Sequence, residues 1–232
     1  MKSQIISAGL IALSIAILGF CIKTGIDNFV NKDNRVTVKG LAEVEVEADK
    51  VTWPIVFKEI GDNLPELYDR INKTQSLIKS FLLQNGITEE DITVNPPAVI
   101  DMSAQRYDSN VKYRYNITSC ITVTSKNVKL VRSIISKQGA LLKDGIAIEE
   151  GGYENPITYE FVSFADMKPK MMQEAIENAA KTAQQFAEHS HSKLNKIIRA
   201  DQGQFSIEDR DVNTPFIKKV RVVTTITYSL KD

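Results

Sequence analysis

VTWPIVFKEI, residues 51–60, is the stretch that decides the fold class of this chain. Val51, Trp53, Ile55 and Phe57 alternate with their neighbours, and this period of two is typical of a half-buried β-strand. Pro54 interrupts the pattern because proline has no N–H to donate to a sheet. We therefore expect a strand that lies at a sheet edge or bulges at Pro54.

The segments on either side extend this pattern. Residues 36–46 alternate again and predict a first strand, with a bulge or bend at Gly40. After residue 60, apolar side chains recur at steps of three and four, which predicts a helix. Asn63 suits its N-cap, Pro65 its first turn and Gly86 the residue after its end.

The remaining elements are expected in an order that resembles the first part. They are an extended segment at 92–100, a strand at 111–123, a helix at 127–138 that ends at Gly139, strands at 146–150 and 157–164, a helix at 166–190, and strands at 194–207 and 217–230. The long helix carries a core stripe whose alanines imply a close approach to a sheet: Met167, Met171, Met172, Ala175, Ile176 and Ala179. The whole pattern predicts an α+β fold of antiparallel sheets, each covered by helices on one face, with a weak internal duplication (ββαββ-α-ββαββ).

The N-terminus predicts a membrane anchor. Residues 5–22 are 18 residues without a charge, which as a helix would reach about 27 Å and nearly cross a bilayer. A cleaved signal peptide is a second interpretation, although residues 23–26 are a poor cleavage site. Lipidation at Cys21 is a third, but Phe20 stands where such a signal has a small residue. The expected organisation is an anchor or signal segment at 1–23, a linker at 24–34 and one domain at 35–232.

Charge and composition exclude some partners. The 29 basic and 29 acidic residues balance, so no basic excess exists to bind nucleic acid or an anionic membrane surface. Two stretches do interleave arginine with tyrosine, at residues 106–107 and 113–115, but no wider basic patch supports them. We expect no nucleic-acid partner.

No catalytic constellation can be assembled from the sequence, and we predict no catalytic, cofactor-binding or metal-binding residues. His189 and His191 point in nearly opposite directions on a helix, so they favour a solvated helix end over a metal site. Cys120 falls on the strand face opposite the large apolar residues and has no nearby histidine to activate it. Three further features are interpreted as solvated faces or turns: Glu43, Glu45 and Glu47; Glu149, Glu150, Glu208, Asp209 and Asp211; and Gly151 with Gly152.

Several motifs, in this order and spacing, resemble the SIMPL-domain family of bacterial envelope proteins. They are VTVKG at 36–40, EVEV at 43–46 with Asp49, LQNGITEEDI at 83–92, the strand at 115–124 leading into Val128, the alanines at 175, 179, 180, 183 and 187, and KLNKI at 193–197. The resemblance covers about residues 35–231. One departure is HSHS at 189–192, where the family tends to have a short turn containing glycine.

The resemblance implies a non-enzymatic protein of the cell envelope that is linked to envelope stress and, as in some members, forms homo-oligomers. We expect an inner-membrane anchor and a soluble domain in the periplasm, although a secreted periplasmic form is also consistent with the sequence. Sheet edges left open in one copy are available for pairing between copies, and we expect them at the Pro54 strand and at residues 217–230. The alternatives are a periplasmic protein that binds a small ligand in an apolar pocket, and a hydrolase that joins Glu43, Glu45 or Glu149 to His189.

Overall fold

The computed structural model describes residues 13–26, 34–104, 112–149 and 154–231. The chain divides into two compact units, which are described separately below. The first unit contains residues 1–44, 166–206 and 220–232, and the second contains residues 45–165 and 207–219.

The described elements confirm a fold of mixed helices and antiparallel strands. In chain order they are β1 (Arg35–Glu47), β2 (Lys50–Gly61), α2 (Leu64–Gln84), η1 (Glu89–Asp91), β3 (Ile92–Val94), β4 (Ala98–Asp101), η2 (Met102–Ala104), β5 (Tyr115–Ser125), α3 (Val128–Ile135), α4 (Gly139–Lys143), β6 (Ile148–Glu149), β7 (Thr158–Glu160), α5 (Phe164–His189), β8 (Lys193–Asp209) and β9 (Ile217–Lys231).

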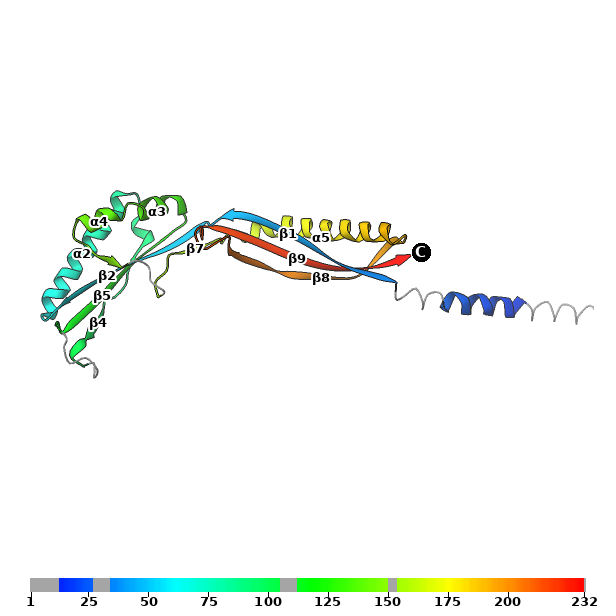
Figure 1. The fold of residues 1–232 in the computed structure, drawn as a ribbon, viewed down its shortest axis with the longest axis horizontal. Coiled ribbons are helices and arrows are strands. Elements are labelled where there is room, and N and C mark those ends of the chain that lie inside the picture. The colour runs from blue at the N-terminus through cyan, green and yellow to red at the C-terminus, as the bar shows by residue number, and fades with distance from the viewer. Residues whose placement is uncertain (1–12, 27–33, 105–111, 150–153, 232) are drawn as a thin grey trace, which may run out of the picture. The chain divides into compact units, whose positions relative to one another are not determined.

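The second unit is a six-stranded sheet with helices on one face. Its order is β3-β5-β2-β6, with β4 also paired to β5 and β7 to β2. Figure 1 shows α2, α3 and α4 together on one side of these strands. The strand face predicted from residues 51–57 is fully buried beneath these helices, and the core that it forms is made of large side chains: Val51, Trp53, Ile55, Phe57, Leu67, Ile71, Ile78, Leu82, Ile117, Ile121, Val123, Val131 and Ile134.

The predicted ends of α2 are confirmed. The Asn63 side chain accepts a hydrogen bond from the backbone N–H of Glu66, which satisfies one of the free donors at the helix start. Gly86 follows the end of the helix with a φ of +94°, a conformation that glycine adopts without strain. These caps define where the helix begins and ends. The buried residues between them, Leu67, Ile71, Ile78 and Leu82, form the apolar stripe that faces the sheet.

The first unit is a three-stranded sheet in the order β1-β9-β8 with α5 running along it (Figure 1). The backbone of Leu230 donates to the carbonyl of Asn34 over 2.8 Å, and the hydroxyls of Thr37 and Thr227 lie 2.9 Å apart. Residue numbers therefore rise along β1 where they fall along β9, so the two strands are antiparallel.

Small residues set the distance between α5 and this sheet. Ala175, Ala179, Ala183 and Ala187 are buried along the helix, as its alanine pattern predicts. A Cβ atom built on Gly40 of β1 would lie 2.8 Å from the Cβ of Ala179 and would overlap the carbonyl oxygen of Ala175. Because Gly40 has no side chain, the backbone of α5 can lie directly against β1 at this position. The bulge predicted there is wrong, because exposed and buried residues of β1 keep alternating through Gly40.

Other boundaries also differ from prediction. Gly139 begins a second short helix, α4, so the helix predicted at 127–138 is two helices. Tyr113 lies before β5 and Val111 lies outside the described residues. The two sheets do not correspond to the two predicted halves, because β1 from the start of the chain pairs with β9 from its end.

The predicted anchor is described only in part. Residues 13–26 form a helix whose side chains are all exposed, and this helix continues past residue 24, where the linker was expected. Residues 1–12 and 27–33 lie outside the described residues. No helix within the described ranges is both long and apolar enough to cross a membrane.

Candidate functional site

The two strands expected as open edges both lie inside their sheets. β2 pairs with β5 along its whole length and with β6 and β7 on its other side. β9 lies between β1 and β8. Pro54 is accommodated because β7 pairs with residues 50–52 and β6 with residues 56–57, so Pro54 falls between the two short partners. The prediction of these edges is therefore wrong.

β8 forms an end of the three-stranded sheet instead. Thirteen of its 17 residues are exposed, far more than in either of the other two strands of the sheet. Ile197 and Ile198 are 53% and 47% exposed. In the described chain no strand pairs with the outer side of β8, so its backbone N–H and C=O groups there are available to another chain.

The sequence carries a signal for this edge that periodicity alone missed. Lys193, Lys196 and Arg199 fall at both odd and even positions, so both faces of the strand carry charge. A strand with one buried face alternates strictly, as β9 does with Val220, Val222 and Ile226. The lack of alternation in β8 therefore marks a strand with little burial on either face.

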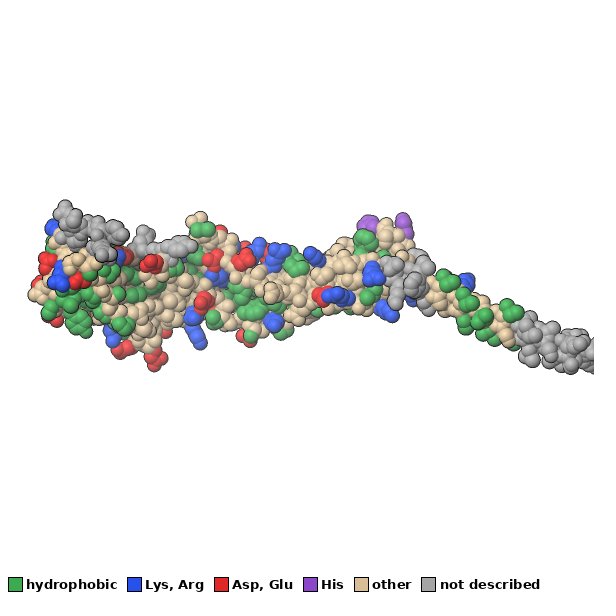
Figure 2. Space-filling model, turned by 90° about the horizontal axis from the view of Figure 1, so that it is seen from below, with side chains coloured by type: hydrophobic (Ala, Val, Ile, Leu, Met, Phe, Trp, Pro, Cys, Tyr) green, Lys and Arg blue, Asp and Glu red, His purple; other side chains and the backbone are tan. Residues whose placement is uncertain are grey.

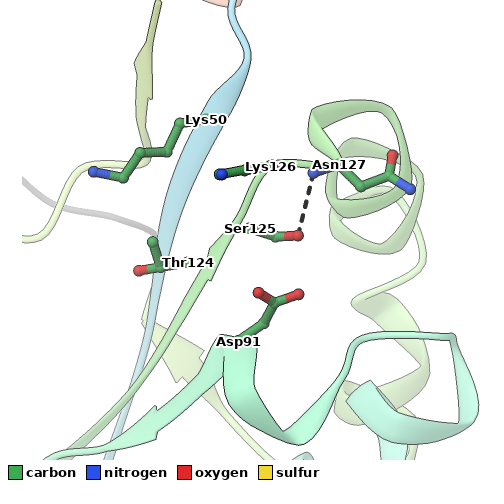
Figure 3. A pocket seen from close by; sticks show the side chains of 6 residues that line it. All are labelled: Lys50, Asp91, Thr124, Ser125, Lys126 and Asn127. Atoms are coloured by element: carbon green, nitrogen blue, oxygen red, sulfur yellow. Dashed lines mark hydrogen bonds between the residues drawn. The ribbon is translucent and has the colours of Figure 1, made fainter. Parts of the chain in front are cut away.

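A second candidate site is a shallow cleft of about 410 Å³ in the second unit, where β5 runs into α3. Figure 3 shows its polar lining, with the backbone N–H of Asn127 donating to the Ser125 hydroxyl over 3.2 Å. Lys50 is already paired with Glu160 at 2.8 Å, and the Asn127 side chain caps α3 by accepting from Leu130. Lys50, Ser125 and Asn127 are therefore engaged within the fold, whereas the side chains of Asp91, Thr124 and Lys126 make no hydrogen bond or ion pair within the described residues.

The histidines lie at the exposed end of α5 (purple in Figure 2), where a solvated helix end was expected. His191 has a φ of 58°, and the backbone N–H of Ser192 donates to the carbonyl of Ala187 over 2.9 Å. This is the left-handed turn that often closes a helix and usually contains glycine. The HSHS sequence, although it departs from the family pattern, thus forms the same kind of turn, with His191 in the left-handed conformation.

Cys120 lies on the sheet face opposite the core, as predicted. Its thiol is half-buried, and its Sγ lies 3.7 Å from the hydroxyl of Thr122. Core residues Ile121 and Ser119 on either side of it point the other way. A threonine hydroxyl does not act as a base toward a thiol, so this contact does not activate Cys120.

The acidic residues that were candidates for catalysis have structural partners. Glu45 lies 3.4 Å from Arg210, Glu47 lies 3.0 Å from Lys129, and Glu149 lies 2.7 Å from Lys58. Glu43 lies on the same exposed side of β1. These ion pairs fit the interpretation of solvated strand faces.

Asp211 organises the turn between β8 and β9. It accepts hydrogen bonds from the hydroxyl and backbone N–H of Thr214 and from the N–H of Asn213. The hydrogen bond from the Thr214 side chain, followed by the one from Arg210, lowers the pKa of Asp211 to about 2. Asp209 pairs with the buried Lys218. Both carboxylates thus support the hairpin.

Arg114, the arginine of the predicted cation–aromatic stretch at 113–115, also has partners within the fold. Arg114 contacts Asp101 through two nitrogens at 2.9 and 3.1 Å, and its guanidinium lies 4.9 Å from the centre of the Tyr115 ring. Hydrogen bonds from Arg114 and then Ser103 lower the pKa of Asp101 to about 2. The other stretch, at 106–107, lies outside the described residues, as do Glu150 and the Gly151–Gly152 pair.

No group of three or more histidine, cysteine or acidic side chains within the described residues could hold a metal ion. The described chain is thus an α+β protein in which helices cover one face of each antiparallel sheet, and β1 and β8 stand at the two ends of the three-stranded sheet.

This chain belongs to the SIMPL family, described as proteins of unknown function (DUF541), which matches residues 36–228. The match runs from β1 to near the end of β9 and includes both units. It confirms the resemblance drawn from the sequence motifs. No curated protein matches the chain.

Proposed function

We propose that this protein is a non-enzymatic module of the bacterial cell envelope that acts by assembling with copies of itself. The observation that carries the proposal is the open edge of β8, a 17-residue strand that is exposed along most of its length. An edge of this length is an aggregation hazard in a free monomer, and pairing between copies removes the hazard. The role in envelope stress is proposed from the family resemblance.

The proposed location rests on the N-terminal sequence. Residues 5–22 carry no charge and are long enough to cross a bilayer as a helix. An anchor in the inner membrane would keep many copies in one plane and raise their effective concentration, so that even weak edge pairing would be populated. The soluble region would then lie in the periplasm.

Light scattering coupled to size exclusion tests the assembly directly. The intact chain, purified in detergent with the micelle mass subtracted, is expected to elute with a protein mass that is a multiple of the 26.0 kDa monomer. The expected mass should fall toward that of the monomer on dilution. A constant monomer mass up to tens of micromolar would contradict the proposal.

Binding of a small ligand remains the alternative, and the cleft around Lys50 and Asn127 is where it would be tested. The residues that line this cleft are polar or charged, although most of the surface that they turn toward it is apolar, and the sequence-based alternative expected an apolar pocket. A ligand that binds the folded state raises the melting temperature. A screen of small periplasmic metabolites that shifts the melting temperature, and that loses the shift in Lys126→Ala, would favour ligand binding over assembly.

A further inference from the structure

The sheet of the second unit has one face that none of that unit's described α-helices covers. Its helices α2, α3 and α4 all lie on the other side (Figure 1). Ile55 of β2 and Ile121 of β5 lie opposite each other and are completely buried on the helix side. Because side chains alternate along a strand, the even-numbered residues of β2 and β5 point away from the helices. We call this second side the outer face.

The outer face is nearly free of unpaired charge. The strands of this sheet place four charged side chains on it, and these form two ion pairs, Lys58 with Glu149 at 2.7 Å and Lys50 with Glu160 at 2.8 Å. Both pairs lie along one side of the sheet, where β2 meets β6 and β7. The middle of the face is apolar or weakly polar: Pro54, Val56, Ile60, Thr118, Cys120 and Thr122.

The polar groups in the middle of the outer face can be buried at little cost. The Thr122 hydroxyl accepts a hydrogen bond from the Asn95 side-chain amide over 3.1 Å, and the Cys120 Sγ lies 3.7 Å from the same hydroxyl. A buried polar group is costly when it loses its hydrogen bonds to water without replacement. The Thr122 hydroxyl already has a partner within the fold, so it keeps this hydrogen bond when water is removed.

The uncovered sheet face of the first unit is different and serves as an internal reference. Thr37 of β1 and Thr227 of β9 meet on it, while the residues that alternate with them are buried toward α5. Lys39 and Arg221 lie on this same face, and both are exposed. A sheet face that meets water is polar and charged, whereas the centres of protein interfaces are poor in charge. The outer face of the second unit therefore has the composition of an interface.

We propose that two copies of this chain stack face to face through the outer face of the second unit. This inference rests on the proposed assembly and names a surface for it. A face without net charge does not repel its own copy, and a two-fold contact uses the same surface on both partners. Stacked sheets pack about 10 Å apart with their side chains between them. Val56 and Cys120 lie opposite each other near the middle of the paired strands, so both would be buried near the centre of the contact.

The size of the outer face predicts a weak contact. β2 and β5 pair from residue 51 to residue 61, and the sheet is four strands wide. At about 3.4 Å per residue and about 4.8 Å between strands, the face covers roughly 500 Å² on each copy. A total of about 1,000 Å² is at the lower limit for a specific interface. Such a contact is populated mainly when an anchor raises the effective concentration of the copies.

A single buried charge tests the contact in the full chain in detergent. Thr118 lies opposite Lys58, so the new carboxylate of Thr118→Glu has a cross-strand partner in the free copy. Stacking would bury one added carboxylate on each copy. We expect Thr118→Glu to dimerise at least tenfold more weakly than the wild type in light scattering across a dilution series. Undiminished dimerisation of this variant would overturn the proposal.

The matched control is Thr225→Glu, which adds the same charge to the uncovered face of the first unit. Thr225 lies on β9, the middle strand of its sheet, and is half-buried as Thr118 is. This variant should dimerise like the wild type. Equal weakening by both variants would overturn the proposal, because the loss would then not depend on the outer face.

The Cys120 thiol gives a second measurement that needs no added charge. In Cys21→Ser, Cys120 is the remaining cysteine, and a small aromatic disulfide reagent measures its accessibility. The reaction should be at least fivefold slower at concentrations where the protein is dimeric than after dilution to the monomer. Thr225→Cys in a Cys21→Ser, Cys120→Ser background is the control, and its rate should not depend on protein concentration.

The outcomes separate this inference from the proposed function. A Cys120 rate that stays constant while the mass falls on dilution would overturn the outer-face contact and leave assembly through another surface, such as the edge of β8. A wild type that stays monomeric up to tens of micromolar would overturn both.

Discussion

The two units of this protein pack a helix against a sheet in opposite ways. In the second unit, α2 and the sheet meet through large side chains such as Phe57, Ile71 and Leu82. In the first unit, α5 meets the sheet through Ala175 and Ala179, with no side chain at Gly40. The second unit is stabilised by large side chains on both helix and sheet, whereas in the first the alanines of α5 lie against sheet residues that include Val36, Val38, Ile226 and Tyr228.

The difference teaches that the same kind of substitution has different consequences in the two units. Removing atoms from a core of large side chains leaves a cavity and loses apolar burial. Adding atoms where two backbones touch forces the elements apart. We therefore expect the core of the second unit to be sensitive to truncation and that of the first to be sensitive to enlargement.

The largest expected effect is a truncation in the second unit. Phe57 is 1% exposed, so Phe57→Ala should lower the free energy of unfolding by about 3–5 kcal/mol. Trp53, the only tryptophan, is buried in the same core, and its fluorescence during urea unfolding measures the effect. The control is Phe186→Ala, which removes a 52% exposed ring and should cost less than about 0.5 kcal/mol. An equal loss of unfolding free energy in Phe57→Ala and Phe186→Ala would contradict the expected difference between a buried and an exposed ring.

The next effect is an enlargement in the first unit. Gly40→Ala adds one carbon against the Ala175 carbonyl and should cost about 1–3 kcal/mol. Faster amide hydrogen exchange along α5 measures the loosened packing. Gly139→Ala is the matched control, because a Cβ built there has no atom within 4 Å and alanine favours the helix. Protection of α5 that is unchanged by Gly40→Ala would show that the backbones do not touch.

The smallest effect is an acid dependence of the second unit. Hydrogen bonds from Thr214 and then Arg210 lower the pKa of Asp211 from 3.8 to about 2. The folded state therefore favours the carboxylate. Its stabilisation is complete above about pH 3.8 and is lost as the pH falls through about 2. An NMR titration of the Asp211 carboxyl should show a midpoint near 2, and Asp211→Asn should flatten stability over this range. A midpoint near 3.8 would contradict the hydrogen-bonded turn.

Much of the local structure could be predicted from residue patterns. Asn63 and Gly86 set the ends of α2 as expected, because capping depends on neighbouring residues. The buried face of β2 was also correct, since burial on one face leaves a period of two in the sequence. The candidate site was not predictable in this way. The strands expected at edges were interior, because strand order depends on pairings between distant residues.

The sequence by itself determined where most of the helices and strands would form, although not all of their ends, and it determined that the alanines of α5 would approach a sheet closely. These properties follow from interactions within a few residues and from the partition of apolar side chains away from water. Only the tertiary structure decided which strand stands at the edge, that Gly40 receives the helix backbone, and that Pro54 falls between β6 and β7. Such features arise when segments far apart in the chain meet, and no local pattern records which segments will be neighbours.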